Sequence, residues 1–492
     1  MIIEILLISI YSGCLLLVFL YAIAQLGLYF NYLKSKKFSA EALQFNFSNP
    51  EEIPLVTIQL PLYNEMYVLQ RLLKNIAKIN YPREKLEIQV LDDSTDESLQ
   101  QTEELIQGLK KQGLDIKHIT RTKRSGFKAG ALKEGLKTAK GEFIAIFDAD
   151  FMPNEDWLHK TIPFFKDPQI GVVQTRWGHI NRNYSILTKI QAFALDFHFI
   201  LEQVGRNFGN HFINFNGTAG VWRKECILDA GNWEGDTLTE DLDLSYRAQL
   251  KNWKFKYLEE VETPAELPVA ISAAKSQQFR WNKGAAENFQ KLFFILAKDS
   301  SVSWKTKYHS FFHLLNSSMF LLVLVIAILS VPILYIKASH PDWNFIFYGI
   351  AFFGLSTFIF LICYWLTYSK IHGGGFKNFF RFIGLFLAFF SVALGLSVHN
   401  SIAVMEGHFG KKSDFIRTPK FNISNKDEVW RANKYLKREF SFAQILEVLC
   451  LLYFGFAIYS AFKIQDFGLL LFHLMLFMGF GFVLVKSWAF RN

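Results

Sequence analysis

The fold class of the chain is indicated by the stretch Phe143-Ile-Ala-Ile-Phe-Asp-Ala-Asp150. Five consecutive apolar residues predict a strand that is buried on both faces, as is typical of a parallel sheet covered by helices. Two acidic residues, separated by one alanine, follow directly where this strand ends. The stretch therefore predicts an α/β fold with carboxylates at the carboxyl end of a central strand.

The same alternation extends over residues 45–300. Short apolar runs predict further strands at 56–61, 86–91, 116–119 and 170–175, and segments with helical periodicity predict helices at 68–79, 97–111 and 129–139. Strands that alternate with helices of this length favour a mainly parallel sheet with helices on both faces. Ligands of such sheets bind at the carboxyl ends of the strands, so functional side chains are expected there.

Long apolar segments flank this region. Hydrophobic residues make up 51% of the 492 residues and charged residues only 20%, which excludes a disordered chain and a small disulfide scaffold. A bilayer core of about 30 Å requires about 20 apolar helical residues. Segments of this kind lie at 5–33, 319–336, 343–369, 441–462 and 467–485, so we expect five transmembrane helices.

The basic residues predict the orientation of these helices. Lys34, Lys36 and Lys37 follow the first apolar segment, and positive charge is retained in the cytoplasm, so the N-terminus should lie outside. If a further apolar segment, 382–398, crossed the membrane, residues 411–438, with nine Lys or Arg against three Asp or Glu, would also lie outside. We therefore expect this segment to lie in the interface, or to enter the membrane and return.

These features divide the chain into five parts. We expect an N-terminal transmembrane helix with its linker at 1–44 and a cytosolic α/β domain with interfacial helices at 45–300. Two transmembrane helices would follow at 301–376, an interfacial segment and a cytosolic loop at 377–440, and two transmembrane helices at 441–492, with the C-terminus inside. The α/β domain is thus inserted between transmembrane helices.

Two acidic groups follow strands of the predicted sheet. Asp92 and Asp93 close the second strand, and Asp148 and Asp150 close the fourth. Carboxylates at such positions are suitable ligands for Mg²⁺ or Mn²⁺, which typically binds through one or two carboxylates and the phosphates of a substrate. The alternative is that these residues form solvated turns or helix caps, but two acidic strand ends in one sheet favour the metal site.

A third acidic group, Glu240 and Asp241, begins a segment with helical periodicity. One of these carboxylates could serve as a general base beside the ion-bound phosphates. Alternatively, Thr239 caps the helix and the acidic residues only face its dipole. The residues alone leave both interpretations open.

Basic and aromatic residues complete the candidate site. Arg280 could bind a diphosphate through paired hydrogen bonds, and Trp281 offers a flat face for a sugar ring. Lys128, near the start of a predicted helix, could meet a phosphate there. The alternatives are an interfacial Arg-Trp anchor and an ordinary surface lysine.

Together these motifs resemble those of the membrane family 2 glycosyltransferases, which include cellulose and hyaluronan synthases. The matching elements are Pro61-Leu-Tyr-Asn-Glu65, Leu91-Asp-Asp-Ser94, Asp148-Ala-Asp150, Thr239-Glu-Asp241 and Gln277-x-x-Arg-Trp281. Within the family, the cellulose-synthase-like A and C proteins, which are mannan and β-glucan synthases, are the most similar. Three stretches of this chain resemble motifs of these proteins: Phe147-Asp-Ala-Asp-Phe151, Val173-Gln-Thr-Arg-Trp177 and Phe215-Asn-Gly-Thr-Ala-Gly-Val-Trp222.

The resemblance implies a GT-A fold, which is Rossmann-like, and a role for each matching residue. Asp148 and Asp150 would bind the metal, and Asp241, beside Glu240, would be the catalytic base. The nucleotide sugar would be bound by Tyr63, Glu65, Asp93, Lys128, Asp148, Gln277 and Arg280. The acceptor would lie beside Trp281 and the residues Phe215, Asn216, Gly217 and Thr218.

A loop near the C-terminal end resembles the gating loop that covers the nucleotide in cellulose synthases. Its matching residues are Phe415, Thr418 and Lys420. Arg417 stands where a valine is usual, and Phe421 stands where a glycine is usual. The resemblance places this loop in the cytosol, which agrees with the charge argument for 411–438.

The function implied is inverting transfer of a hexose from GDP-mannose or UDP-glucose onto a growing β-linked polysaccharide, coupled to export across the plasma (inner) membrane. Mg²⁺ or Mn²⁺ would be the cofactor. The partners would be the nucleotide-sugar donor, the acceptor and membrane lipids, and no nucleic acid is expected. The sequence does not identify the sugar, the linkage, the product length or any partner subunit.

Two alternative functions are also compatible with the sequence. The first is transfer of a single sugar to a membrane lipid, which uses the same chemistry. The second is a transporter or channel with a nucleotide-sensing domain, which the absence of an internal transport repeat disfavours. Glu447, within an apolar segment, is either a functional intramembrane group or a residue at the headgroup level.

Overall fold

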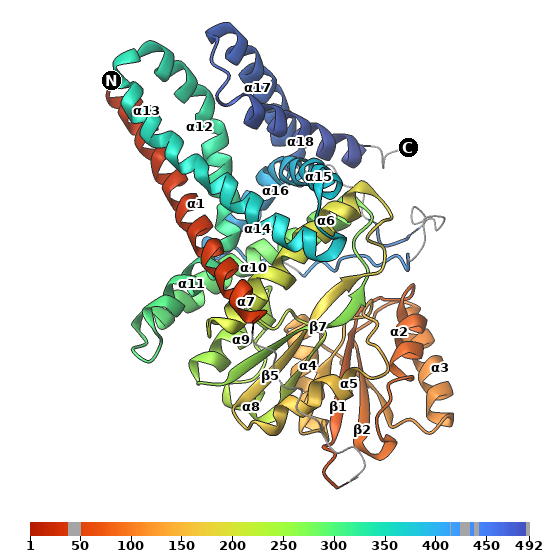
Figure 1. Ribbon diagram of the computed structural model, residues 1–492. Helices are drawn as coiled ribbons and strands as arrows, with labels where there is room; N and C mark the ends of the chain where they lie inside the picture. Colours follow the sequence, from red (N-terminus) through yellow and green to blue (C-terminus); the bar gives the residue numbers. More distant parts are fainter. Residues whose placement is uncertain (38–50, 414, 424–432, 437–441, 489–492) are drawn as a thin grey trace.

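The computed structural model describes residues 1–37, 51–413, 415–423, 433–436 and 442–488. Within these ranges a sheet domain lies against a group of long helices (Figure 1). The boundaries predicted at residues 44 and 440 lie outside the described residues, and the five-part division of the chain stays a prediction.

The sheet has seven strands in the order β3-β2-β1-β4-β6-β5-β7. Their bounds are β1 Val56–Leu62, β2 Leu86–Asp92, β3 Ile116–Thr120, β4 Phe143–Ile146, β5 Ile170–His179, β6 Gly220–Arg223 and β7 Lys254–Ala265. Only β6 runs antiparallel to its two neighbours, β4 and β5, among these strands. The predicted mainly parallel α/β fold is therefore confirmed.

The strands β6 and β7 were absent from the sequence prediction. The strand β6 has only four residues, too few for a periodic pattern. The strand β7 carries Glu259, Glu260 and Glu262, and its residues are only partly buried because it lies at the edge of the sheet. A charged edge strand has little of the apolar signal on which the prediction depends.

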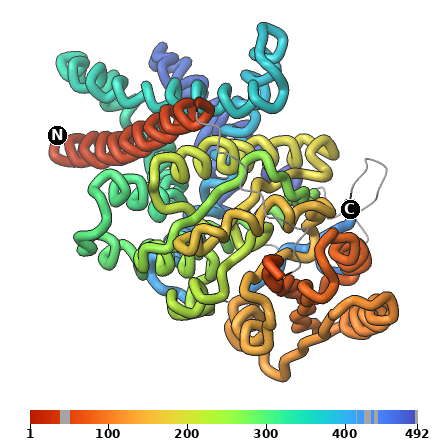
Figure 2. The backbone as a smooth tube through the Cα atoms, turned by 60° about the horizontal axis from the view of Figure 1, so that its bottom comes forward, coloured from red at the N-terminus to blue at the C-terminus, as the bar shows by residue number. Residues whose placement is uncertain are grey.

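Two hydrophobic cores lie on the two faces of the sheet. Phe143 and Ala145 of β4 point into the core beneath α2 (Leu69–Ile76) and α3 (Ser98–Lys111). Ile144 and Ile146 point into the core beneath α4 (Phe127–Thr138), α8 (Lys224–Asp229) and α9 (Glu240–Leu250). The apolar run at 143–147 is thus buried on both faces, as the pattern predicts. Figure 2 shows α2 and α3 on the side of the domain away from α1.

Among the described residues, six helical segments are long and apolar enough to cross a membrane. They are α1 (Ile2–Ser35), α11 with α12 (Trp304–Leu315, Met319–Ser339), α13 with α14 (Asn344–Ala351, Leu355–His372), α15 (Phe376–Gly395), α17 (Phe442–Ile464) and α18 (Leu470–Trp488). Five of the six overlap a predicted span. The sixth, α15, packs against α18 and against α6 (Ile186–Asp196), and whether it crosses stays a prediction.

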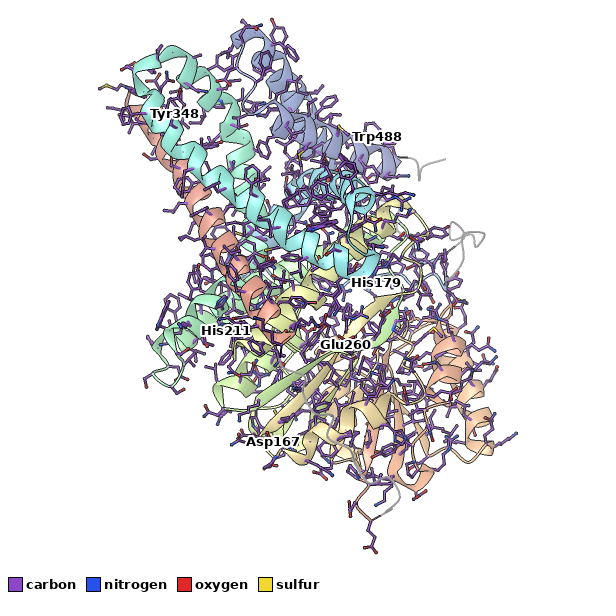
Figure 3. The ribbon with its side chains drawn as sticks, viewed as in Figure 1. Asp167, His179, His211, Glu260, Tyr348 and Trp488 are labelled. Carbon is purple, nitrogen blue, oxygen red and sulfur yellow. The ribbon has the colours of Figure 1, made fainter. Side chains whose placement is uncertain are left out.

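The carboxyl edge of the sheet faces these helices. Figure 3 shows Asp167, just before β5, at the far end of the domain and His179, the last residue of β5, close to the helical part. Between sheet and helices lies α10 (Ile271–Lys298), along which α16 (Ser397–His408) packs. The edge at which functional residues are expected therefore adjoins the helical part.

Candidate active site

A cavity of about 170 Å³ opens at the carboxyl edge of the sheet. Strand ends, α4, α9, α10 and residues 415–420 form its walls. The sequence-predicted site residues that line it are Tyr63, Glu65, Asp93, Lys128, Asp148, Asp150, Asn216, Gly217, Glu240, Asp241, Gln277, Arg280, Trp281, Phe415, Arg417, Thr418 and Lys420. The fold thus brings together residues from segments that are far apart in the sequence, while their individual roles stay predictions.

Two residues predicted beside the acceptor lie behind the cavity wall instead. Phe215 is fully buried, with its ring centroid 5.5 Å from that of Trp222. Thr218 is also buried, and its hydroxyl accepts a hydrogen bond of 2.8 Å from the backbone N–H of Asp148. These two residues are not among those that line the cavity, and their place beside the acceptor stays a prediction. The turn that leads into β6 directs Asn216 and Gly217 to the cavity and its neighbours to the core.

The two carboxylates after β4 have basic partners. Lys128 Nζ donates to Asp148 over 2.6 Å, and Lys420 Nζ lies 2.8 Å from Asp150 Oδ2. Asp150 is almost fully buried, and in the described part of the chain its Oδ1 atom has no hydrogen-bond partner. An unsatisfied buried carboxylate oxygen is a costly group in the absence of a ligand. These residues therefore fit a hard divalent cation, which prefers such oxygens.

Asp241 lies in the first turn of α9, close to Gly217. A side-chain carbon on Gly217 would come within 3.1 Å of Asp241 Oδ2, and the φ of Gly217 is +79°, so glycine permits this close approach. Burial and the neighbouring carboxylate of Glu240 raise the pKa of Asp241 to about 7. A carboxylate with such a pKa is suited to accept a proton near neutral pH.

Thr239 does not cap α9 through its side chain, which was the alternative interpretation of this motif. Thr239 is the residue before α9, but its side chain makes no capping hydrogen bond to the helix. Its hydroxyl instead accepts a hydrogen bond of 2.9 Å from the side chain of Asn288 on α10. The threonine therefore joins the first turn of α9 to α10.

Four residues of the segment 415–420 line the cavity: Phe415, Arg417, Thr418 and Lys420. The Phe415 ring stacks on Phe127 at 5.5 Å, and Arg280 lies 4.7 Å from the centre of the Phe415 ring. Arg417 pairs with Glu65 at 2.6 Å. Thus Arg417 and Lys420 each pair with a carboxylate of the site.

Comparison with known proteins agrees with this geometry. Residues 54–284 match the sequence profile described as "Glycosyltransferase like family 2". This segment is a family 2 glycosyltransferase domain. Its predicted membership of the family is thereby confirmed.

Curated relatives are similar over about two thirds of this chain. A "Probable glucomannan 4-beta-mannosyltransferase 4" of Oryza sativa subsp. japonica is 38% identical over 65% of this chain and 61% of its own length. A "Glucomannan 4-beta-mannosyltransferase 2" of Arabidopsis thaliana is 37% identical over 65% of this chain and 62% of its own length. The chain thus spans about three fifths of the length of these relatives.

A solved structure supports the fold of the glycosyltransferase. The "Mannosyltransferase PcManGT from Pyrobaculum calidifontis in complex with GDP-Man and Mn2+" superimposes with a TM-score of 0.54 at 18% identity. The match covers 82% of this chain and all of that one. The GT-A fold is therefore confirmed.

Several residues of the glycosyltransferase cavity were missed by the sequence prediction. Trp177 and His179 line the cavity from the end of β5, and Glu266 lines it just after β7. Arg124 lies over the ring of Tyr63, 3.4 Å from its centre. The residues at the end of β5 could have been predicted as site residues, because the carboxyl ends of all parallel strands lie at the same edge of the sheet. Arg124 belongs to a loop without a recognisable pattern.

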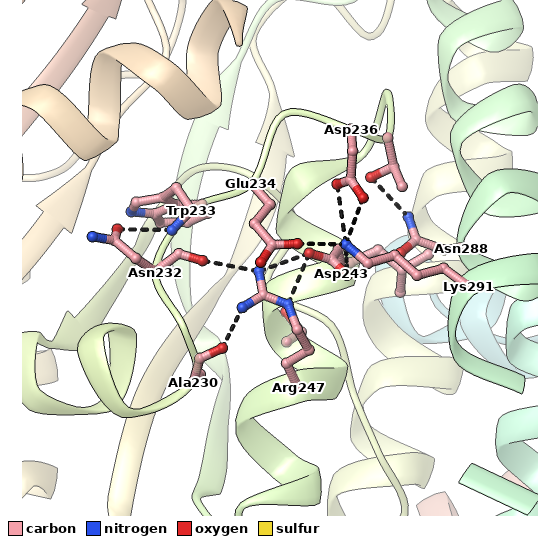
Figure 4. Close-up of polar contacts among 12 residues, drawn as sticks. Ala230, Asn232, Trp233, Glu234, Asp236, Asp243, Arg247, Asn288 and Lys291 are labelled. Carbon is pink, nitrogen blue, oxygen red and sulfur yellow. Dashed lines mark hydrogen bonds and ion pairs between the residues drawn. The ribbon is translucent and has the colours of Figure 1, made fainter. Parts of the chain in front are cut away.

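An acidic cluster outside the cavity has its own cation. Among the described residues, Glu234, Asp236 and Asp243 bring carboxylate oxygens within 4.8 Å of one another. Lys291 Nζ lies between them, at 2.7 Å, 2.9 Å and 3.0 Å (Figure 4). Arg247 also pairs with Asp243. The ammonium group neutralises the cluster and ties α9 to α10, so the cluster is an ion-pair network that holds the first turn of α9 in place.

Glu447, within an apolar helix, has a basic partner. Its carboxylate is fully buried and accepts hydrogen bonds of 2.7 Å and 3.0 Å from Lys275 Nζ on α10. The carboxylate is therefore paired inside the protein, and its depth in the membrane stays a prediction. The pair joins α17 to the helix that carries Arg280.

Proposed function

We propose that this chain is a membrane-bound hexosyltransferase that transfers mannose from GDP-mannose onto a growing β-linked mannan or glucomannan, with UDP-glucose as a second donor. One observation carries the proposal: Asp148, Asp150, Asp241 and Arg280 line one cavity. The names of the relatives, which are glucomannan 4-beta-mannosyltransferases, support the choice of donor.

The side chains suit a single inverting displacement. Asp241 accepts the proton of the acceptor hydroxyl as that oxygen attacks the anomeric carbon, and the bond to the diphosphate breaks. Arg280 and Lys128, both lining the cavity, bind the departing nucleoside diphosphate and stabilise its charge. An α-linked donor thereby yields a β-linked product.

Asp148 and Asp150 are the residues that would hold Mg²⁺ or Mn²⁺. The bound ion would supply positive charge to the diphosphate leaving group. Tyr63, Glu65, Asp93 and Gln277 would contact the rest of the donor, and Trp281 would stack on the acceptor sugar.

The location of the cavity favours a polymer product. It lies at the edge of the sheet domain that faces the helical part, and six segments of that part could span a membrane. We propose that the catalytic domain lies in the cytosol at the plasma (inner) membrane and that the product is exported through the helical part. The residues 415–420 would act as a gate over the nucleotide.

A donor screen tests this proposal. The purified full chain in detergent, with Mn²⁺, is given GDP-mannose or UDP-glucose, and the released diphosphate and the labelled product are measured. A high-molecular-weight product that a β-mannanase degrades supports the proposal. A label that extracts into organic solvent would indicate transfer to a lipid. Nucleotide binding without turnover would favour a sensing domain of a transporter.

A further inference from the structure

A network of buried polar side chains lies directly behind Asn216. It is centred on a π-helical turn, Phe197–Glu202, between α6 and α7 (Gln203–Phe208). Turns of this kind occur frequently at functional sites, because they redirect side chains within a helix. The turn places His198, Glu202 and the following Gln203 toward the residues before β6.

The hydrogen bonds of this network fix the orientation of the Asn216 amide. His198 Nδ1 lies 2.8 Å from Glu202 Oε2, and His198 Nε2 lies 3.0 Å from Asn216 Nδ2. Gln203 Nε2 donates to Asn216 Oδ1 over 2.7 Å. The backbone N–H of Asn216 donates to Gln174 Oε1 over 3.0 Å. Both ends of the amide are therefore bound.

The positions of the protons in this network follow from the ionisation of the Glu202 carboxylate. Burial opposes its ionisation, but Arg206 and the hydrogen bond from His198 lower the pKa of Glu202 to about 2, so it only accepts hydrogen bonds near neutral pH. His198 consequently donates through Nδ1–H, and the Nε2 atom of the neutral imidazole is then an acceptor. Asn216 must then present its N–H to His198 and its oxygen to Gln203, and the reverse orientation would lose both bonds. One N–H and one oxygen lone pair of Asn216 are left over.

Asn216 lines the cavity next to Gly217, whose backbone approaches the carboxylate of Asp241. We propose that Asn216 binds a hydroxyl of the acceptor sugar, and that His198, Glu202 and Gln203 are positioning residues that fix its amide for this contact. The inference rests on the proposed function, and it assigns a role to three residues that touch neither donor nor metal site. Hydroxyl binding by a preorganised amide requires little ordering when the acceptor arrives.

Binding of an acceptor measures this role directly. The purified full chain, with GDP and Mn²⁺, is titrated with β-1,4-mannotetraose or cellotetraose, and tryptophan fluorescence is recorded. We expect His198→Ala to weaken oligosaccharide binding about tenfold, the effect of one lost well-placed hydrogen bond, and to change the affinity for GDP less than twofold. His198→Gln, whose amide oxygen can still accept from Asn216, should recover most of the loss.

Two comparisons separate positioning from a merely structural role. His313→Ala is the matched control, because His313 is a buried histidine that bonds Tyr246 and lies outside the cavity lining. The double variant His198→Ala with Asn216→Ala should bind no more weakly than Asn216→Ala alone, since His198 acts through Asn216.

The possible results decide between the proposals. The positioning role would be overturned if His198→Ala bound the oligosaccharides as tightly as the unmodified chain, or if it lost as much affinity for GDP as for the oligosaccharides. It would also be overturned if the losses of oligosaccharide affinity in the two single variants multiplied in the double variant. Failure of the unmodified chain to bind either oligosaccharide would overturn it as well. Binding of oligosaccharide and nucleotide without hexose transfer would contradict only the proposed function.

Discussion

Lys420 Nζ lies 2.8 Å from Asp150 Oδ2, and both side chains are largely buried. Asp150 is also a proposed metal ligand. An ammonium group therefore stands beside the oxygen atoms that a divalent cation would need. A cation bound at the unpaired Oδ1 atom would face the ammonium group across one carboxylate, so the loop and the ion compete for the charge of Asp150.

Replacing Lys420 should remove this competition. We expect Lys420→Ala to bind Mn²⁺ several-fold more tightly in the absence of nucleotide, because one unit of positive charge leaves a buried site. Its transfer activity should fall, since the loop at 415–420 loses its pairing with Asp150. Calorimetric titration with Mn²⁺ measures the affinity, and Lys412→Ala, at an exposed position, serves as the control. Equal or weaker Mn²⁺ binding in Lys420→Ala would refute the competition.

Asp241 is expected to be the group whose loss abolishes transfer. Asp241→Asn keeps the shape of the side chain but cannot accept a proton, so turnover should fall about 10²- to 10⁴-fold. Nucleotide affinity should stay within a few-fold of that of the unmodified chain. Single-turnover transfer and nucleotide binding are measured on the same preparation. Near-full activity of Asp241→Asn would show that the base is another residue.

The raised pKa of Asp241 also predicts how stability depends on pH. The folded chain binds this proton up to a pH of about 7, whereas an unfolded chain releases it near the ordinary value of 3.8. Between these values the folded state holds more protons, so this group lowers the stability of the fold as pH rises. Asp241→Asn lacks the effect and should gain thermal stability relative to the unmodified chain between pH 5 and pH 8. Melting temperatures of the two proteins are measured in EDTA across this pH range. A difference between them that did not change with pH, or that favoured the unmodified chain, would contradict the prediction.

The sequence pattern predicted the parts of this site that lie on periodic elements. The apolar run at 143–147 placed Asp148 and Asp150 at the end of a buried strand, because strand periodicity is local. The pairing of Arg417 with Glu65 joins residues 352 positions apart, and no local pattern encodes it. The burial of Phe215 behind Asn216 likewise depends on how the turn before β6 is oriented. Tertiary packing, and not residue type, decides which side of a short motif faces the ligand.

Gly284 controls the distance between α10 and the first turn of α9. A side-chain carbon at Gly284 would lie 2.5 Å from Thr239 Oγ1 and 2.8 Å from its backbone nitrogen. Gly284→Ala should therefore displace the turn that carries Asp241 and reduce transfer by more than tenfold, while the sheet domain stays folded. Gly349→Ala, where the added carbon meets no atom within 4 Å, is the control. Equal activity of the two variants would show that this contact does not position the catalytic turn.

The Lys275–Glu447 pair should stabilise the packing of α10 on α17 only while both partners are present. Both carboxylate oxygens of Glu447 bind Lys275 Nζ, and the carboxylate has no exposed area. Glu447→Ala leaves a charged lysine without its buried partner, which typically costs about 3–5 kcal/mol. The double variant Lys275→Met with Glu447→Leu removes both charges and should regain most of that loss, because the desolvation cost of the pair disappears with it. Thermal unfolding in detergent compares the three proteins. A double variant less stable than Glu447→Ala would show that the ion pair contributes more to the stability of the fold than the neutralisation of two buried charges. The position of α10 beside the cavity would then depend on the charges themselves.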